Sequence, residues 1–438
     1  VLDSVSPANF PRTNPEVLGR VVETGGLCLA QGMATATDDW FRLVSGAPAA
    51  GADTFRVGET VAVTEGEVIL RTPLCEVIQY RPKTATVQRE PVVIVPAWIL
   101  KYYILDLSPR NSLVRHLIEQ GFTVFMISWK NPTPADRDIG FDDYRRLGVL
   151  PALTAALAIT GATKAHAVGY CLGGTLLAIA AAAMARDGDD RIASLTFLAA
   201  QTDFDEAGEL KLFINDSQVA FIEDLMWQRG VLAGSQMAGT FHLLRSNDLV
   251  WSKMIHRYLM GEPDPVSDIS AWLANVTHMP YRMHSDYLRS LYLNNDLAAG
   301  RFKVDGRPIV IQDIRTPIFA LGAESDRVAP WRSVYKFRLL ADADVTFALT
   351  NGGHNLGVVS EPGHEGRNYR IGHSGTRDHY VDPDSWFGAT PVRNGSWWPA
   401  WFDWLRSRPS ERVAPPPQGR REAGYHSLGP APGSYVFE

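Results

Sequence analysis

The sequence predicts an α/β protein with a mostly parallel central sheet and a helical cap inserted into it. Short apolar runs alternate with longer helical stretches from about residue 91 to 204, and the alternation resumes after about residue 302. This rhythm is typical of parallel strands that are covered by helices on both faces. Between the two stretches, residues 205–301 carry Trp, Tyr, Phe and Met at helical spacing, which indicates an inserted cap, although the same spacing is typical of ordinary core helices.

Short apolar runs mark the expected strands. Six of them belong to the parallel part of the sheet: residues 91–95, 122–129, the run ending at Val168, 193–200, 316–321 and 344–349. Two earlier runs, residues 68–71 and 75–80, indicate a pair of strands, and the alternating residues 56–64 indicate one more. A helix is expected from Thr175 to Arg186, where an Ala-rich run contains neither Gly nor Pro.

Changes in composition divide the chain into five expected parts. They are a remnant of an N-terminal domain at 1–66, the first part of the sheet domain at 67–204, the cap at 205–301, the second part of the sheet domain at 302–410, and a C-terminal tail at 411–438. The tail is rich in Pro, Gly and Arg, which predicts an extended segment. The chain opens on Val1 rather than Met, which suggests that it begins inside a longer protein.

The bulk properties exclude several classes of protein. A formal net charge of −6 over 438 residues gives no basic surface of the kind that binds nucleic acid. Three cysteines, Cys28, Cys75 and Cys171, are an odd and sparse set, which favours a reducing compartment over a disulfide framework. No apolar run approaches the length of a membrane span, and the first residues do not form a signal peptide. A cytosolic protein is therefore expected.

The strongest motif is the run Gly169-Tyr-Cys171-Leu-Gly173 between an expected strand and an expected helix. This strand–turn–helix context is typical of a nucleophile elbow, with cysteine where the motif usually carries serine. The two glycines suit a sharp turn in which a side chain would collide with the strand or the helix. Cys171 would stand at the N-terminus of the helix, where the helix dipole favours a thiolate. The alternative is a buried structural cysteine in a Gly-rich turn.

An elbow nucleophile requires a base, and the base requires a carboxylate that orients it. In the α/β-hydrolase fold these partners follow the nucleophile in the order acid then histidine, each on a loop after a late strand. Asp326 follows the strand that ends at Leu321, and His354 follows the strand that ends at Leu349. We therefore predict a Cys171–His354–Asp326 triad, with Glu324 as the competing acid.

The oxyanion hole is expected to use backbone N–H groups. One belongs to Leu172, the residue after the nucleophile, and a second comes from Trp98 or Ile99, in the loop after the strand at 91–95. The sequence shows neither a zinc-binding set nor a phosphate-binding loop, so we expect no metal and no cofactor. It does not identify the residues that bind the substrate.

With these residues in view, the chain resembles the polyhydroxyalkanoate synthases, most of all those of class I. The resemblance spans nearly the whole chain. Its marks are Ser6-Pro-Ala-Asn-Phe, Trp98-Ile-Leu-Lys-Tyr-Tyr, Gly169-Tyr-Cys-Leu-Gly-Gly, Tyr287-Leu-Arg-x-x-Tyr292, Ser325-Asp-Arg-Val-Ala-Pro-Trp331 and Gly353-His354. The cysteine elbow together with the Trp98 block is highly specific.

The resemblance implies an acyltransferase that polymerises (R)-3-hydroxyacyl-CoA, with 3-hydroxybutyryl-CoA as the expected monomer. CoA would be released, and the acyl group would be held as a thioester on Cys171; CoA enters as part of the substrate and not as a cofactor. The resemblance also implies a homodimer on polyester granules in the cytoplasm, and a preceding helical sequence that this chain largely lacks. Two alternatives stay open: a thioesterase or polyester hydrolase with the same triad, and a granule-bound protein without turnover.

Overall fold

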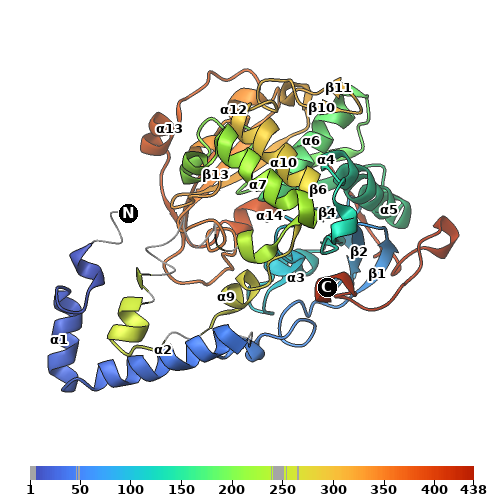
Figure 1. Ribbon diagram of the computed structural model, residues 1–438. Helices are drawn as coiled ribbons and strands as arrows, with labels where there is room; N and C mark the ends of the chain where they lie inside the picture. The colour runs from blue at the N-terminus through green and yellow to red at the C-terminus, as the bar shows by residue number, and fades with distance from the viewer. Residues whose placement is uncertain are drawn as a thin grey trace. The chain divides into compact units, whose positions relative to one another are not determined.

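The computed structural model describes residues 6–45, 47, 50–237, 239, 251–252, 254–263 and 266–438 (Figure 1). The chain forms two compact units: one comprises Val1–Arg56 and Gly234–Val276, and the other comprises Val57–Ala233 and Thr277–Glu438. The predicted cap, residues 205–301, therefore contributes to both units. The five-part division of the chain stays a prediction.

The first unit is helical. Asn14 caps helix α1 (Pro15–Thr24) by accepting hydrogen bonds from the backbone N–H groups of Glu16 and Val17. The long helix α2 (Leu27–Ser45) packs against the π-helix η9 (Met254–Leu259). The carboxylate of Asp39 on α2 joins the two helices, since it accepts hydrogen bonds from the side chains of Arg257 and Tyr258 at 2.9 and 2.7 Å. Among the residues of this unit that the structure describes, the other helices are η2 (Pro7–Asn9), η3 (Ala52–Thr54) and α9 (Asp268–Leu273).

The second unit is built on a ten-stranded sheet in the order β1-β2-β5-β4-β6-β7-β12-β13-β14-β15. The six strands from β5 to β13 run parallel to one another, and two antiparallel strands flank them on each side. Their bounds are β1 Gly66–Arg71, β2 Cys75–Tyr80, β4 Val92–Val95, β5 Val124–Trp129, β6 Ala165–Tyr170, β7 Ile192–Leu198, β12 Ile318–Ala323, β13 Val345–Thr350, β14 Asn368–Ser374 and β15 Arg393–Asn394. The predicted mostly parallel sheet is confirmed.

Helices cover both faces of this sheet. Adjacent residues of a strand point to opposite faces. On β7, Thr196 accepts a hydrogen bond from the indole of Trp401 on α14 (Trp398–Arg406), whereas the ring of Phe197 stacks at 4.2 Å on Phe337 of α12 (Phe337–Leu340). The two helices therefore lie on opposite faces. Central strands that are buried on both faces explain why the sequence showed continuous apolar runs there.

The other helices of this unit connect the strands, belong to the inserted segment or, for the last two, lie in the C-terminal segment. They are η4 (Tyr102–Asp106), α3 (Leu113–Glu119), η5 (Pro134–Asp136), α4 (Phe141–Tyr144), η6 (Arg145–Val149), α5 (Leu150–Thr160), α6 (Leu172–Arg186), η7 (Gly208–Phe213), α7 (Asp216–Arg229), α10 (Tyr281–Asp286), η10 (Tyr287–Leu293), η11 (Ile311–Asp313), α11 (Trp331–Tyr335), α13 (Pro383–Ala389), η12 (Arg421–Ala423) and η13 (Tyr435–Phe437). Helices α7 and α10 lie side by side (Figure 1). An ion pair between Glu223 of α7 and Arg289 of η10, at 2.6 Å, ties the two ends of the insertion together.

Short strand pairs complete the second unit. They are β3 (Val87–Gln88) with β16 (Arg412–Val413), β8 (Val231–Leu232) with β9 (Met279–Pro280), and β10 (Lys303–Val304) with β11 (Arg307–Pro308). The strand predicted at residues 56–64 is wrong. Gly58 adopts a left-handed conformation with φ of 80°, so the chain turns there, and only an isolated bridge joins Val57 to Val61.

The C-terminal segment packs against β1 and β2. Val68 of β1 exchanges backbone hydrogen bonds with Leu428 and Gly429, at 2.8 and 2.9 Å. Further along, the buried carboxylate of Glu76 accepts hydrogen bonds from the backbone N–H groups of Ser434 and Tyr435, at 2.8 and 3.0 Å. The segment that the sequence predicted to be extended is therefore anchored on a charged group in the interior.

Replacing Glu76 by glutamine is expected to lower the free energy of unfolding by about 3 kcal/mol, because buried donors lose a charged acceptor. Burial alone would raise the pKa of Glu76, but hydrogen bonds from Tyr435, Arg71 and Ser434 outweigh burial and hold that pKa below its usual value. A depressed pKa stabilises the fold above the unfolded pKa of about 4.3 and ceases to do so as the pH falls through the folded pKa. The free energy of unfolding of the wild type should therefore fall in acid by the contribution of Glu76. The glutamine variant has no such contribution, so its free energy of unfolding should not show this fall.

Urea unfolding at neutral and acidic pH measures both effects. The control is Glu65→Gln, which removes a carboxylate that is 67% exposed and pairs with Arg81 at 3.4 Å. This control should change the free energy of unfolding by less than about 0.5 kcal/mol. Equal unfolding energies for Glu76→Gln and the wild type would show that Glu76 does not anchor the segment.

Candidate active site

The predicted elbow is present at the end of β6. The strand ends at Tyr170, helix α6 begins at Leu172, and Cys171 stands between them with φ of 53° and ψ of −128°. A positive φ is costly for a residue other than glycine and persists only where the surroundings impose it. Here the N–H of Cys171 donates to the carbonyl of Leu198 at 2.9 Å, which fixes the turn to the neighbouring strand β7. The side chain of Cys171 is partly exposed.

The glycines of the elbow are required by close approach. A Cβ on Gly169 would collide with the backbone of Gly174, and a Cβ on Gly173 would collide with the carbonyl groups of Val95 and Pro96. The start of α6 therefore lies directly against the end of β4. This contact brings the elbow next to the loop in which the sequence predicts the second oxyanion donor.

The predicted acid and base meet beyond the ends of β12 and β13. The side chain of Asp326 is fully buried, and its Oδ2 lies 2.7 Å from Nδ1 of His354. Its Oδ1 accepts hydrogen bonds from the N–H groups of Val328 and Ala329, at 2.8 and 2.9 Å. The competing acid Glu324 is exposed, so Asp326 is the carboxylate that the structure brings to His354.

His354 also faces Cys171. Burial alone would lower the pKa of His354, but the carboxylate of Asp326, which hydrogen-bonds to the ring, and the nearby sulfur of Cys171 raise it well above its usual value. Because Asp326 occupies Nδ1, the nitrogen left for Cys171 is Nε2. The structure thus brings the three predicted side chains together in the order sulfur, imidazole, carboxylate. This arrangement can move a proton from the thiol to the imidazole and stabilise the resulting imidazolium.

The predicted oxyanion donors lie on two segments that meet at the elbow. In the described part of the chain, no acceptor is bonded to the N–H groups of Leu172, Trp98 or Ile99. The carbonyl groups of Trp98 and Ile99 accept hydrogen bonds from the Oγ1 and the N–H of Thr277. These bonds hold the loop after β4, and the three N–H groups remain available to an oxygen of a substrate.

Two tyrosines near the nucleophile were not assigned a role from the sequence. Tyr287 and Tyr292 belong to the π-helix η10, and their hydroxyl groups lie 3.3 Å apart. Burial raises the pKa of Tyr287, and the neighbouring Tyr292 and the Cys171 sulfur raise it further. The spacing of five residues concealed the pair, because in an α-helix such residues point in different directions, whereas a π-helix closes its turns at i+5.

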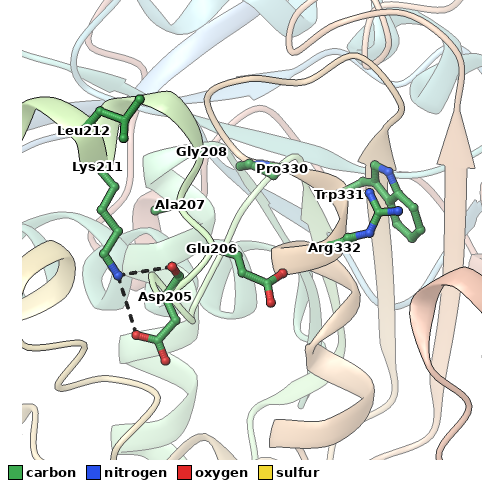
Figure 2. A pocket seen from close by; sticks show the side chains of 9 residues that line it. All are labelled: Asp205, Glu206, Ala207, Gly208, Lys211, Leu212, Pro330, Trp331 and Arg332. Atoms are coloured by element: carbon green, nitrogen blue, oxygen red, sulfur yellow. Dashed lines mark hydrogen bonds and ion pairs between the residues drawn. The ribbon is translucent and has the colours of Figure 1, made fainter.

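A cavity of about 420 Å³ lies beside the loop that carries Asp326 (Figure 2). Lys211 on one side of it donates to the backbone carbonyl groups of Phe204 and Asp205 and lies 3.7 Å from the carboxylate of Asp205. Arg332 on the other side stacks over the Trp331 ring at 4.7 Å and pairs with Asp384. Both cations are therefore engaged, and the cavity offers no unpaired charge to an anionic ligand.

Neither a metal-binding cluster nor a membrane-spanning helix is present in the part of the chain that the structure describes. Across the residues it describes, His, Cys, Asp and Glu side chains form no group of three or more that is arranged to hold a metal ion. Among the same residues, no helix combines the length and the apolar character that crossing a membrane requires.

Comparison with known proteins agrees with this geometry. Residues 90–361 match the family described as alpha/beta hydrolase fold, and residues 1–117 match the family described as Poly-beta-hydroxybutyrate polymerase (PhaC) N-terminus. Among solved structures, the chain is similar to a monoacylglycerol lipase from Paleococcus ferrophilus, with 15% identity, a TM-score of 0.41, and coverage of 76% of this chain and 99% of that chain.

Curated relatives match over the full length of the chain. The poly(3-hydroxyalkanoate) polymerase of Methylorubrum extorquens is 41% identical over 442 residues, which cover 100% of this chain and 72% of the relative. The poly(3-hydroxyalkanoate) polymerase subunit PhaC of Rhizobium meliloti is 36% identical, and the match covers 100% of this chain and 70% of the relative. For the PhaC subunit of Cupriavidus necator the identity is 35%, and the match covers 99% of this chain and 74% of the relative.

The parallel sheet and the elbow between β6 and α6 place the chain in the class of α/β hydrolase folds, as the sequence predicted. Within this class, the chain belongs to the poly(3-hydroxyalkanoate) polymerase family. The resemblance found in the sequence is confirmed.

Proposed function

We propose that this protein polymerises (R)-3-hydroxyacyl-CoA, with 3-hydroxybutyryl-CoA as the monomer, and that Cys171 carries the growing polyester as a thioester. One observation carries the proposal: His354, held by Asp326, lies close enough to an elbow cysteine to feel its charge, in a chain whose relatives are named poly(3-hydroxyalkanoate) polymerases. A cysteine suits this reaction, because exchange between two thioesters is nearly balanced in free energy and the acyl-enzyme stays reactive toward an alcohol.

The first half-reaction loads the enzyme. Nε2 of His354 takes the thiol proton of Cys171, and the sulfur attacks the thioester carbonyl of the substrate. The N–H groups of Leu172 and of Trp98 or Ile99 donate to the oxyanion that forms. The bond between the carbonyl carbon and the CoA sulfur then breaks, and CoA leaves with the proton from His354. Between these steps His354 is protonated, and the groups that raise its pKa stabilise this imidazolium.

The second half-reaction lengthens the chain. The 3-hydroxyl group of the next monomer or of the chain end attacks the acyl carbonyl on Cys171. An ester bond forms, the carbon–sulfur bond breaks, and Cys171 recovers a proton. We assign the removal of the hydroxyl proton to His354 rather than Asp326, because both carboxylate oxygens of Asp326 already accept hydrogen bonds and its side chain is buried.

Water must be kept from the acyl-enzyme, since hydrolysis would turn the protein into a thioesterase. The aromatic side chains of Tyr287 and Tyr292 lie near the nucleophile. The ring of Phe204 packs against that of Tyr292, with 4.9 Å between the two ring centroids. These side chains support polymerisation over hydrolysis, because they occupy space near the sulfur that water would otherwise fill.

The polyester itself is the proposed partner of the first unit. Helix α2 exposes large apolar side chains, with Met33 69%, Trp40 63% and Phe41 67% exposed. Such a cluster is typical of a surface that binds an apolar partner. We include in the proposal a homodimer bound to polyester granules in the cytoplasm, as the resemblance implies.

The experiment separates polymerisation from hydrolysis. The protein is incubated with (R)-3-hydroxybutyryl-CoA, thiol release is followed with a chromogenic disulfide, and the products are divided into sedimentable polyester and soluble 3-hydroxybutyrate. We expect thiol release to be matched by polyester, with the protein in the same pellet. Thiol release matched by free acid would identify a thioesterase, and protein that releases no thiol but sediments with added polyester granules, and not without them, would identify a binding protein.

A further inference from the structure

A hydrogen bond joins the two loops that carry the nucleophile and the base. The hydroxyl of Tyr170, the last residue of β6, donates to Oδ1 of Asn355 at 2.6 Å. Tyr170 directly precedes Cys171, and Asn355 directly follows His354. The bond therefore connects residues next to the two reacting side chains, although 185 positions separate them in the chain.

The ring of Tyr170 also supports the imidazole. Its centroid lies 5.6 Å from that of His354, with the two planes tilted by 37°. Tyr170 is only 2% exposed, so its ring has little freedom to move. Burial raises the pKa of Tyr170 well above its usual value, so its hydroxyl keeps its proton, and its role as a donor, throughout the neutral pH range.

The loop that carries His354 needs such a connection. It begins after β13 at Asn351, whose side chain bonds to Gly366 and Asn368, and Gly352, with a φ of 97°, and Gly353 follow before His354. The far end of the loop is held by the indole groups of Trp397 and Trp398, which donate to the carbonyl groups of Gly357 and Val358. Asn355 lies between these two anchored ends, and its bond to Tyr170 ties the middle of the loop to the nucleophile strand.

We propose that Tyr170 and Asn355 are positioning residues, and that the hydrogen bond between them sets the separation of Cys171 and His354. The inference rests on the proposed function, in which a proton passes between these two side chains. A displacement of about 1 Å between reacting groups can reduce a rate by about a hundredfold. Loss of the bond should therefore act on the chemical step and leave the affinity for the substrate unchanged.

The test is a double-mutant cycle with Tyr170→Phe, which keeps the ring, and Asn355→Leu, which removes the acceptor. Each variant should lower kcat for thiol release by about ten- to a hundredfold and leave KM unchanged. The double variant should be no slower than the slower single variant, because both substitutions break one bond. If Tyr170→Phe does not fold, Asn355→Leu and Asn355→Ala, in the half-buried loop, test the same bond.

A second readout does not depend on polymerisation. The rate at which iodoacetamide alkylates Cys171, followed by peptide mass spectrometry from acid to alkaline pH, reports the pairing of the thiol with His354. Relative to the wild type, both variants should shift the dependence of the alkylation rate on pH in the same direction. This expectation holds whether or not the wild type makes polyester. If the wild type makes no polyester, the proposed function fails, and the alkylation profile still decides the role of the bond.

The matched control is Tyr335→Phe, which removes a hydroxyl that donates to the carbonyl of Val381 at 2.8 Å. It loses a bond of the same kind elsewhere in the unit, and its kcat and alkylation profile should stay those of the wild type. The inference is overturned if both single variants keep kcat within about twofold of the wild type, or if their effects multiply in the double variant.

Discussion

Replacing Cys171 by alanine is expected to stop CoA release from (R)-3-hydroxybutyryl-CoA. The substitution removes the atom that attacks the substrate and the atom that holds the acyl chain, so both half-reactions are lost. For a nucleophile that acts together with its base, removal costs at least about a thousandfold in turnover. Thiol release and sedimentable polyester, measured on equal amounts of folded protein, should both fall to the level of the reaction without enzyme.

Cys75→Ala is the matched control. Cys75 is a buried thiol on β2, and burial raises its pKa to about 12, so it does not ionise near neutral pH. The control should keep its turnover and lose only stability, because a small buried side chain is shortened. Turnover that survives in Cys171→Ala would exclude Cys171 as the nucleophile, whereas turnover that disappears in folded Cys75→Ala would contradict the purely structural role assigned to Cys75.

Asp326→Asn is expected to have the next largest effect, about a thousandfold on kcat. The carboxylate holds Nδ1 of His354 and stabilises its protonated form, whereas an amide cannot supply that charge. Without the carboxylate, one of the two groups that raise the pKa of His354 is lost, so that pKa falls from its raised value. The acidic limb of the profile of kcat/KM against pH reports protonation of the base in the free enzyme, so it should move to lower pH in the variant.

The control for this variant is Glu324→Gln. Glu324 lies two residues before Asp326 and is exposed, so its replacement should leave both kcat and the acidic limb unchanged. The assignment of Asp326 would be wrong if Glu324→Gln moved the acidic limb and Asp326→Asn did not.

The parts of this molecule that could be predicted from the sequence have local signals. The central strands are buried on both faces, so they appear as unbroken apolar runs, and the elbow needs its glycines for steric reasons that act within a few residues. Asp326 and His354 could be placed because parallel strands end at one edge of the sheet, which brings their loops together. The order of the residues in the chain then assigned their roles.

The parts that could not be predicted depend on contacts between distant residues. Tyr170 stands inside the elbow motif, but nothing in that motif points to Asn355, and their bond exists only because β6 and the loop after β13 reach the same place. The anchoring of Ser434 on Glu76 is hidden for the same reason, since the composition of the tail indicates only that it is extended. Tyr287 and Tyr292 are among the marks of the resemblance, but the pairing of their hydroxyl groups could not be predicted, because a π-helix changes which residues share a face.

Mass spectrometry of the enzyme during turnover tests the thioester at Cys171 most directly. The protein is quenched with acid while it consumes (R)-3-hydroxybutyryl-CoA, and its intact mass and peptide masses are measured before and after treatment with hydroxylamine, which cleaves thioesters. We predict added mass in whole hydroxybutyryl units, confined to the peptide that contains Cys171 and removed by hydroxylamine. Polyester made by an enzyme whose Cys171 peptide stays unmodified throughout would contradict the account.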